Sequence, residues 1–400
     1  MSCCHLRVSG SRALFEDADH MPEHGIKEEK KVEYVELIYD LIFVYLIGRN
    51  NSLLHQIEDG FVPGSVFLAY ILCTLAVIQI WNFSTFYINR YGRNGAREYV
   101  FLFLNMYLMY YMAEGTNAHW QSSVYTYSTA WALILVNTAV QYLLELRHHC
   151  ESETEAKQIK RTAAIILGEA ALIGVHMLVY SVTGISAAGV PIAFGIIATM
   201  LSGQVNRAVS VDFAHLSERA MLYVVFTFGE MIIAVSSYFS GFRSFTSVYF
   251  SAMAFLVVIG LLLSYGMLYN HVIDRERRTS GTGYMMLHVF IILALNNISV
   301  ALEFMPEEAI AVKPKNAFLA GSIVLYYVFM FLTELYGKRR QRFARSFKLL
   351  LLSLGGLFLL LIGLLRENGY ITIAITVVFV YGITVIMHFY GKRTEPAEGE

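Results

Sequence analysis

Long apolar runs follow one another along most of the chain, separated by short polar or glycine-containing turns. Residues 349–365 are rich in leucine and carry no charge, and residues 371–387 form another run of similar length. Each run approaches the roughly 20 residues that an α-helix needs to cross a lipid bilayer. The alternating ten-residue pattern of an outer-membrane barrel does not appear. The pattern therefore predicts an all-α, polytopic helical bundle embedded in a membrane.

Hydropathy and turn residues together predict about twelve transmembrane helices. They lie near residues 33–52, 64–88, 98–113, 124–145, 163–182, 187–206, 218–239, 247–270, 284–304, 317–336, 348–365 and 370–390. The alternative count is ten, with two of the weaker segments forming re-entrant loops.

The basic residues are distributed unevenly between the two sides of this topology. One side holds only Arg49, Arg243, Lys313, Lys315 and Arg366, and the other 25 of the 30 Lys and Arg residues fall on the opposite side, which includes both tails. Cytoplasmic loops carry an excess of basic residues in membrane proteins. We therefore expect a multi-pass protein of the cell membrane with both termini in the cytoplasm.

An even number of spans suggests two halves. We expect a polar cytoplasmic tail at residues 1–31, six helices in residues 32–208, six more in residues 209–391, and a cytoplasmic tail at residues 392–400. The first span of each half opens with a glutamate, Glu36 or Glu218, and the same offset places Tyr87 on Tyr269. These matches favour a parallel six-plus-six repeat. Apolar helices align easily with one another, so the sequence leaves the repeat open.

The composition limits the classes of binding partner that the protein is expected to have. Hydrophobic residues make up 56% of the chain and charged residues 15%, whereas soluble domains carry about a quarter charged residues. The formal net charge of −1 gives no reason to expect nucleic acid as a partner. The four cysteines, at positions 3, 4, 73 and 150, show no metal-ligand spacing, and we expect neither a metal nor a cofactor. The first thirty residues lack the apolar core of a cleavable signal peptide.

Two carboxylates stand four residues apart in the first predicted span. Glu36 and Asp40 lie on one helix face, roughly 6 Å apart at Cβ. A carboxylate at mid-bilayer costs about 2.5–3.5 kcal/mol, so the pair should face protein, water or a cation. Glu36 has an alternative place at the headgroup level beside Lys30 and Lys31, which explains Asp40 poorly.

A second group of polar residues opens the seventh predicted span. His215, Glu218 and Arg219 stand at its membrane edge, where the latter two could simply cap and orient the helix. Glu230 lies twelve residues beyond Glu218, about 18 Å along the axis and near the middle of an apolar run. A buried carboxyl at that depth is suited to carry a proton.

Spans two and five add further candidates. Glu169 and His176 are two turns apart on one face, where they would form a relay or bond separately to their neighbours. The second span ends in Trp81, Tyr87, Asn89 and Arg90. Membrane-interface belts explain most such aromatic residues, although Trp81 could line a cavity.

The same positions carry a resemblance to a known family. The segment Glu36-Leu37-Ile38-Tyr39-Asp40-Leu41-Ile42-Phe43-Val44, the segment from Trp81 to Tyr91, and His215 to Arg219 with Gly229-Glu230 resemble three motifs of the bacterial low-temperature-requirement A (LtrA) family. The resemblance implies a multi-pass membrane protein and singles out these residues. It supplies no substrate, because the activity of the family is not established.

Three functions fit these features. We favour a secondary transporter that couples proton or cation movement to a small solute, with Glu36, Asp40 and Glu230 lining a central path. The alternatives are a membrane-embedded enzyme or lipid-handling protein, and a sensor or scaffold whose buried acids only specify helix packing. An enzyme is less favoured, because no nucleophile–base pair or metal triad appears at recognisable spacing and no catalytic residue can be named. The expected partners are the bilayer and a small solute or ion, with a homo-oligomer left open.

Overall fold

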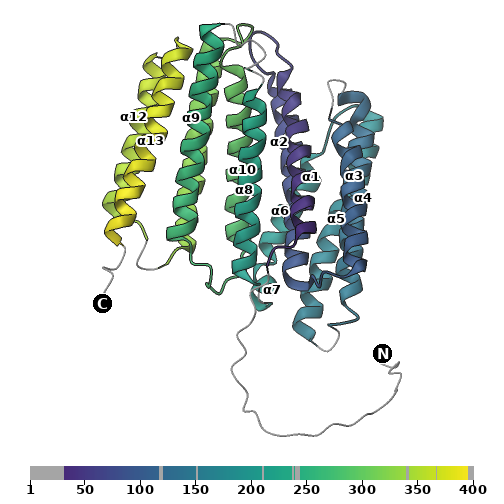
Figure 1. Ribbon diagram of the computed structural model, residues 1–400. Coiled ribbons are helices and arrows are strands. Elements are labelled where there is room, and N and C mark those ends of the chain that lie inside the picture. Colours follow the sequence, from purple (N-terminus) through teal and green to yellow (C-terminus); the bar gives the residue numbers. More distant parts are fainter. Residues whose placement is uncertain are drawn as a thin grey trace, which may run out of the picture.

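Long helices standing side by side form the whole of the bundle (Figure 1). The computed structural model describes residues 31–116, 120–149, 152–209, 211–236, 238, 244–338, 342–365 and 367–394. The predicted N-terminal tail thus lies almost wholly outside the described residues. At the other end the last helix continues to Thr394, three residues beyond its predicted half.

Thirteen α-helices are present in the described part of the chain. In the first half they are α1 (Tyr34–Asn51), α2 (Gly64–Tyr91), α3 (Ala96–Glu114), α4 (Trp120–Glu145), α5 (Glu153–Thr183), α6 (Gly189–Leu201) and α7 (Gly203–Ala208). In the second half they are α8 (Phe213–Val235), α9 (Phe245–Met267), α10 (Thr282–Phe304), α11 (Val312–Leu332), α12 (Arg345–Leu365) and α13 (Gly369–Thr394). Short helical turns η1 (Ser52–His55), η3 (Leu268–Val272) and η4 (Thr333–Tyr336) extend α1, α9 and α11.

Every one of the twelve predicted spans overlaps a helix, with two informative differences. Helix α5 begins ten residues before its predicted span, because Ser152 caps it by accepting a hydrogen bond from the Glu155 backbone amide. The predicted span 187–206 is two helices, since α6 ends at Leu201 and α7 starts after Ser202. Helix α6 is therefore only 13 residues long.

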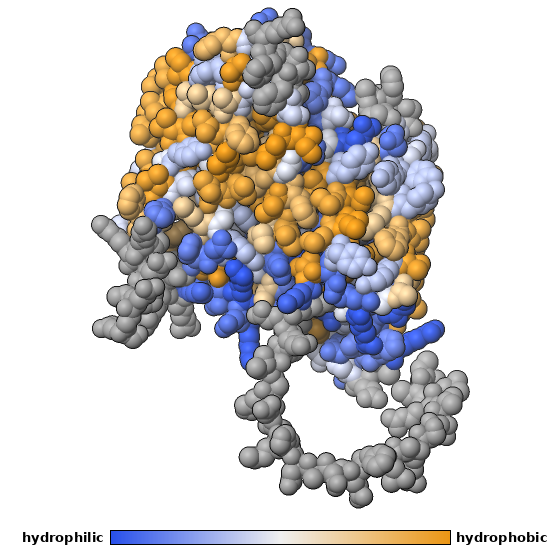
Figure 2. Space-filling view, viewed as in Figure 1, coloured by the Kyte–Doolittle hydropathy of each residue, from blue (hydrophilic) through white to orange (hydrophobic). Residues whose placement is uncertain are grey.

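Seven of these helices are long and apolar enough to cross a membrane: Gly64–Tyr91, Glu153–Thr183, Phe245–Val272, Thr282–Phe304, Val312–Tyr336, Arg345–Leu365 and Gly369–Tyr390. Apolar side chains cover the middle of the bundle surface, and hydrophilic side chains gather at its lower end (Figure 2). The other predicted spans, α1, α3, α4, α6 and α8, are shorter or carry more polar residues. The chain thus has the surface of a protein that lies in a bilayer.

The helices pack in an order that occurs twice. Helix α1 packs against α2 and α3, α3 against α4, α4 against α5, α5 against α6, and α2 against α6. In the second half α8 packs against α9 and α10, α10 against α11, α11 against α12, α12 against α13, and α9 against α13. The two halves meet where α1 and α2 contact α8 and α10. These four helices occupy the middle of the bundle (Figure 1).

Candidate functional site

A charged network lies at the contact between the two halves. It consists of Glu36 and Asp40 on α1 and His215 and Arg219 on α8, and each of the four side chains is at most 2% exposed. Asp40 lies six residues into α1, about 9 Å along the axis, and Arg219 lies six residues into α8. The two first helices of the halves therefore meet through charges at matching depths.

Asp40 is held from two sides. The Arg219 guanidinium donates to both carboxylate oxygens, through Nη2 to Oδ1 and through Nε to Oδ2 at 3.3 Å. The Trp81 indole Nε1 on α2 donates to Asp40 Oδ1 at 2.9 Å. A planar guanidinium suits such a two-oxygen contact, and the indole satisfies a further lone pair. Asp40 is thus a paired carboxylate within the protein interior.

Glu36 contacts the same arginine and the histidine. Its Oε2 lies 3.6 Å from Arg219 Nε and 3.3 Å from His215 Nε2. The other ring nitrogen, His215 Nδ1, lies 3.1 Å from Asn89 Nδ2. Asn89 also donates to the Asp212 carbonyl at 2.8 Å and accepts from the Asp212 backbone amide at 3.1 Å. Asn89 therefore fixes both the start of α8 and its histidine.

The start of α8 explains why this network forms where it does. Asp212 caps the helix by accepting from the His215 backbone amide at 3.1 Å. The cap fixes the first turn, and the four-residue spacing then puts His215 and Arg219 on one face. On the next turn of α8, the Tyr223 ring packs against the Trp81 ring, with 4.5 Å between the ring centroids. The buried Tyr223 hydroxyl has no hydrogen-bond partner in the described part of the chain.

Four other predicted site residues lie outside the charged network. Tyr87 donates to Glu145 at 3.4 Å, in a group that Arg97 of α3 joins, and Arg90 donates to the Asn206 carbonyl at 3.3 Å. Glu218 is half-buried on another face of α8. Glu230 lies eleven residues beyond Arg219, about 16 Å along the axis, with its carboxylate against Gly48.

Glu169 and His176 make separate contacts with different neighbours. Gln79 of α2 donates to Glu169 Oε2 at 2.9 Å, and the Ala187 backbone amide donates to His176 Nδ1 at 3.1 Å. Glu169 and His176 therefore bond separately to their neighbours and do not form a direct relay with each other.

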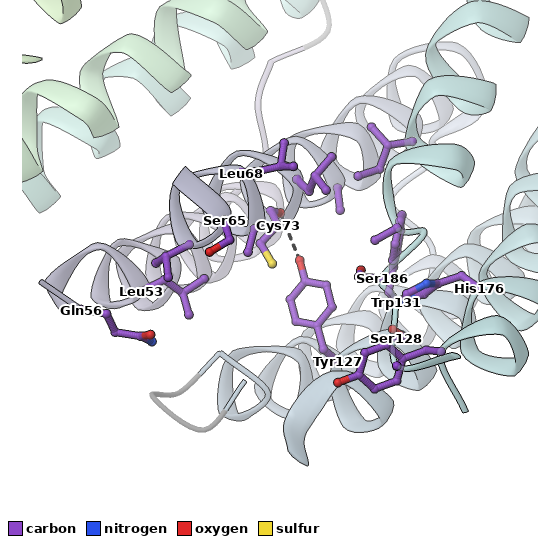
Figure 3. Close-up of a pocket in the computed structure, with 18 residues that line it drawn as sticks. Leu53, Gln56, Ser65, Leu68, Cys73, Tyr127, Ser128, Trp131, His176 and Ser186 are labelled. Carbon is purple, nitrogen blue, oxygen red and sulfur yellow. Dashed lines mark hydrogen bonds between the residues drawn. The ribbon is translucent and has the colours of Figure 1, made fainter. Parts of the chain in front are cut away.

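His176 lines a cavity that we call the vestibule. Its volume is about 740 Å³, and it lies among η1, α2, α4, α5 and α6. Ser65, Leu68 and Ser186 at its rim are exposed, whereas Cys73, Trp131 and His176 deeper in it are at most 3% exposed. Figure 3 shows the Tyr127 ring reaching across it, with the hydroxyl donating to the Cys73 carbonyl on α2 at 3.0 Å. The vestibule is thus an opening at the end of the bundle where α2 begins.

Two smaller cavities continue along α2 beyond the vestibule. One of about 50 Å³ is lined by Gln79, Phe83 and Gly195, and one of about 30 Å³ by Phe86, Arg90 and Asn206. The α2 residues that face the three cavities recur every three or four positions and so form one face. They include Leu72, Ala76, Gln79, Phe83, Phe86 and Arg90. This spacing, with a glutamine inside an apolar run, is the sequence signal that predicts the face.

No group of acidic, histidine or cysteine side chains that could hold a metal occurs among the described residues. The charged side chains of the network pair instead with one another, Arg219 with Asp40 and Glu36, and His215 with Glu36.

Comparison with known proteins places the chain in a family. The family model described as bacterial low temperature requirement A protein (LtrA) matches residues 31–385, which include both the charged network and the vestibule. The comparison with curated proteins found no match. The chain therefore belongs to the bacterial low temperature requirement A family, as a multi-pass membrane protein.

Proposed function

We propose that the protein is a secondary transporter that moves a small solute across the membrane, coupled to protons or cations. The observation that carries this proposal is the row of cavities along α2. Their lining extends from Ser65 to Arg90, about 38 Å along the helix, and a hydrocarbon core is about 30 Å thick. A solute path is the function that best accounts for a row of cavities of this extent in a bundle with an apolar surface.

The path is closed between the vestibule and the smaller cavities. The Gln79–Glu169 hydrogen bond crosses it there, and Gly195 of α6 packs directly against both side chains. A cavity that is wide on one side of a constriction and narrow on the other is the arrangement expected of a carrier that opens to one side at a time. In this proposal Glu169 and Gln79 form the constriction and His176 stands above it.

The repeated packing order supports two parallel six-helix repeats and twelve crossings. A hydrogen bond recurs with it, since Tyr127 of α4 donates to the Cys73 carbonyl of α2, and Tyr326 of α11 donates to the Leu261 carbonyl of α9. With twelve crossings, the basic residues put both termini in the cytoplasm and the vestibule on the outside.

The charged network then joins the two repeats near their cytoplasmic ends. Movement of one half against the other would have to rearrange Asp40, Glu36 and Arg219, which are buried and charged. Such a network favours a small number of discrete arrangements, because an unpaired buried charge is costly. We propose that protonation of Glu36 or Asp40 couples to this movement, and that Glu230 acts separately, beside Gly48.

The test is a current measurement on purified protein in liposomes adsorbed to a solid support. A panel of small solutes is applied under a proton gradient to the wild type, Glu169→Gln, Asp40→Asn and the control Glu367→Gln, which alters a surface carboxylate paired with Lys313. We expect a solute-dependent current that Glu169→Gln and Asp40→Asn abolish and the control keeps. A solute-dependent current that survives both substitutions would refute the coupling. The absence of a current from folded wild-type protein with every solute in the panel would refute transport and favour an enzymatic or sensory role.

A further inference from the structure

A buried acid without a counter-charge lies just beyond the residues that line the vestibule. Glu169 is fully buried, its Oε2 accepts from Gln79, and its Oε1 has no hydrogen-bond partner among the described residues. No lysine, arginine or histidine in the described part of the chain forms an ion pair with it. A buried carboxylate in this setting needs a cation or a proton.

Glu169 lies directly beyond the vestibule. Gln79, its partner, is three residues past the vestibule residue Ala76 on α2, and Gly195 is three residues past the vestibule residue Ile192 on α6. A Cβ atom at Gly195 would overlap both Gln79 Nε2 and Glu169 Oε2. The carboxylate can therefore stand between the helices only because residue 195 has no side chain.

The walls of the vestibule suit a cation that carries an apolar group. Trp131, Tyr127 and Tyr180 contribute aromatic rings, and aromatic faces attract ammonium groups. No lysine, arginine, aspartate or glutamate occurs among the described lining residues. His176 is the one titratable group with basic character there, and its Nδ1 accepts a hydrogen bond from Ala187. An anionic solute would thus meet no fixed positive charge.

A cavity in the second half provides a comparison within the chain. It lies at the corresponding place among α9, α12 and α13, has a volume of about 360 Å³, and is lined by Tyr249, Leu361, Tyr370, Ile371, Ala374, Ile375 and Val378. Its described lining contains no carboxylate and no histidine. The helix arrangement alone therefore does not require a carboxylate such as Glu169 or a histidine such as His176 at this place.

We propose that the vestibule binds a monovalent organic cation, an amine with an aromatic or alkyl group. Its ammonium group pairs with Glu169 Oε1, and its apolar part lies against Trp131 and Tyr127. A volume of about 740 Å³ falls in the usual range for small-molecule sites and far exceeds what a bare metal ion would need. The statement that this cation is also the transported solute rests on the proposed function. The binding site itself does not depend on transport.

Cys73 allows binding to be measured without any transport. It lines the vestibule, so a bound ligand should slow its reaction with N-ethylmaleimide. Cys3, Cys4 and Cys150 are replaced by serine, and labelling of detergent-purified protein is followed by mass spectrometry. Benzylamine, benzyl alcohol and benzoate are the probes, because they share one shape and differ in charge.

We expect benzylamine alone to protect Cys73. In Glu169→Gln its half-protecting concentration should rise about tenfold or more, because a charge-assisted hydrogen bond is lost. Glu367→Gln should match the parent, and size-exclusion profiles verify that each variant is folded. Equal protection by benzyl alcohol would overturn the proposal, as would protection that persists in Glu169→Gln. Failure of maleimide to reach Cys73, or of benzylamine to protect it, would also overturn it. Protection without solute currents would leave the binding site in place and refute only transport.

Discussion

At the scale of single residues, the charged network explains why Glu36 and Asp40 occur inside this membrane protein. Asp40 is paired with Arg219 and Trp81, so its charge is compensated within the protein. A buried ion pair is weak evidence for added stability, because desolvation offsets much of the attraction. Removal of one partner, by contrast, leaves a charge buried without compensation. The network is therefore an element that constrains how α1 and α8 can meet.

Arg219→Met should destabilise the protein by about 3–5 kcal/mol, because it leaves Asp40 charged and buried, and Asp40→Asn should destabilise it less, because Glu36 remains 3.6 Å from Arg219. The double variant Asp40→Leu/Arg219→Met should lose much less than the sum. Glu367→Gln, in the exposed pair with Lys313, should cause no measurable change. Thermal unfolding in detergent gives the melting temperature of all four variants. A wild-type melting temperature for Asp40→Asn would contradict the pairing.

His55 gives a residue-scale prediction outside the spans. Its Nε2 lies 3.0 Å from Glu303 Oε2, and the hydrogen bond that the ring donates to this carboxylate raises the pKa of His55 above 6.5. Because the folded-state pKa is raised, the pair stabilises the fold fully below the unfolded pKa and ceases to do so as pH rises through the folded value. The melting temperature of the wild type should therefore exceed that of Glu303→Gln at acidic pH, with the difference shrinking above neutrality. A difference that grows with pH would contradict this.

At the scale of helices, α6 is the element that shapes the proposed path. It is short, it ends at Ser202, and its Gly195 lets α2 and α5 bring Gln79 and Glu169 together. Its residues also line all three cavities along α2, and in the last of them Thr199 of α6 is joined by Asn206 of α7. A change in the position of α6 would thus open or close the constriction.

Gly195→Ala should separate Gln79 from Glu169, because the new Cβ would overlap the ends of both side chains. Benzylamine protection of Cys73 should weaken, and the melting temperature should fall because a buried carboxylate loses its hydrogen bond. Gly174→Ala on α5, where a Cβ meets nothing within 4 Å, is the matched control and should keep protection. Unaltered protection in Gly195→Ala would refute the role of the glycine.

Helix patterns in the sequence predict the elements well and their pairings poorly. The apolar runs place twelve helices, and the four-residue spacing of Glu36 and Asp40 places both on one buried face. The partner of Asp40 is not predicted, because Arg219 is 179 residues away and the contact depends on how α1 and α8 pack. The sequence likewise does not show that Glu169 meets Gln79 or that Glu230 lies apart from the network. The break at Ser202 is missed, because the run on either side of it stays apolar or weakly polar.

At the scale of the whole molecule, the two halves share one packing order and differ in what their cavities contain. In the first half His176 lines the vestibule and Gln79 lines the next cavity, whereas the cavity among α9, α12 and α13 is apolar. The halves meet at the charged network. One half would then bind the solute, while the second half and the network set the direction in which the path opens.

Twelve crossings predict the side of each loop. Single cysteines at Ser186 and Glu308 should react with a membrane-impermeant maleimide in intact cells, and those at Asn94 and Glu276 only after permeabilisation. These positions lie in the α5–α6, α10–α11, α2–α3 and α9–α10 connections. Labelling of Asn94→Cys and Glu308→Cys from one side would exclude this topology.

The central claim, a solute path along α2 that opens to one side at a time, is tested most directly by labelling positions above and below the constriction. Cys73 lies above it, and Thr199→Cys lies below it. In membrane vesicles of known orientation we predict that an impermeant maleimide reaches Cys73 only from the outside and Thr199→Cys only from the inside. A transported solute should slow one reaction as it speeds the other. Access to both positions from one face, or rates that no solute alters, would contradict the account.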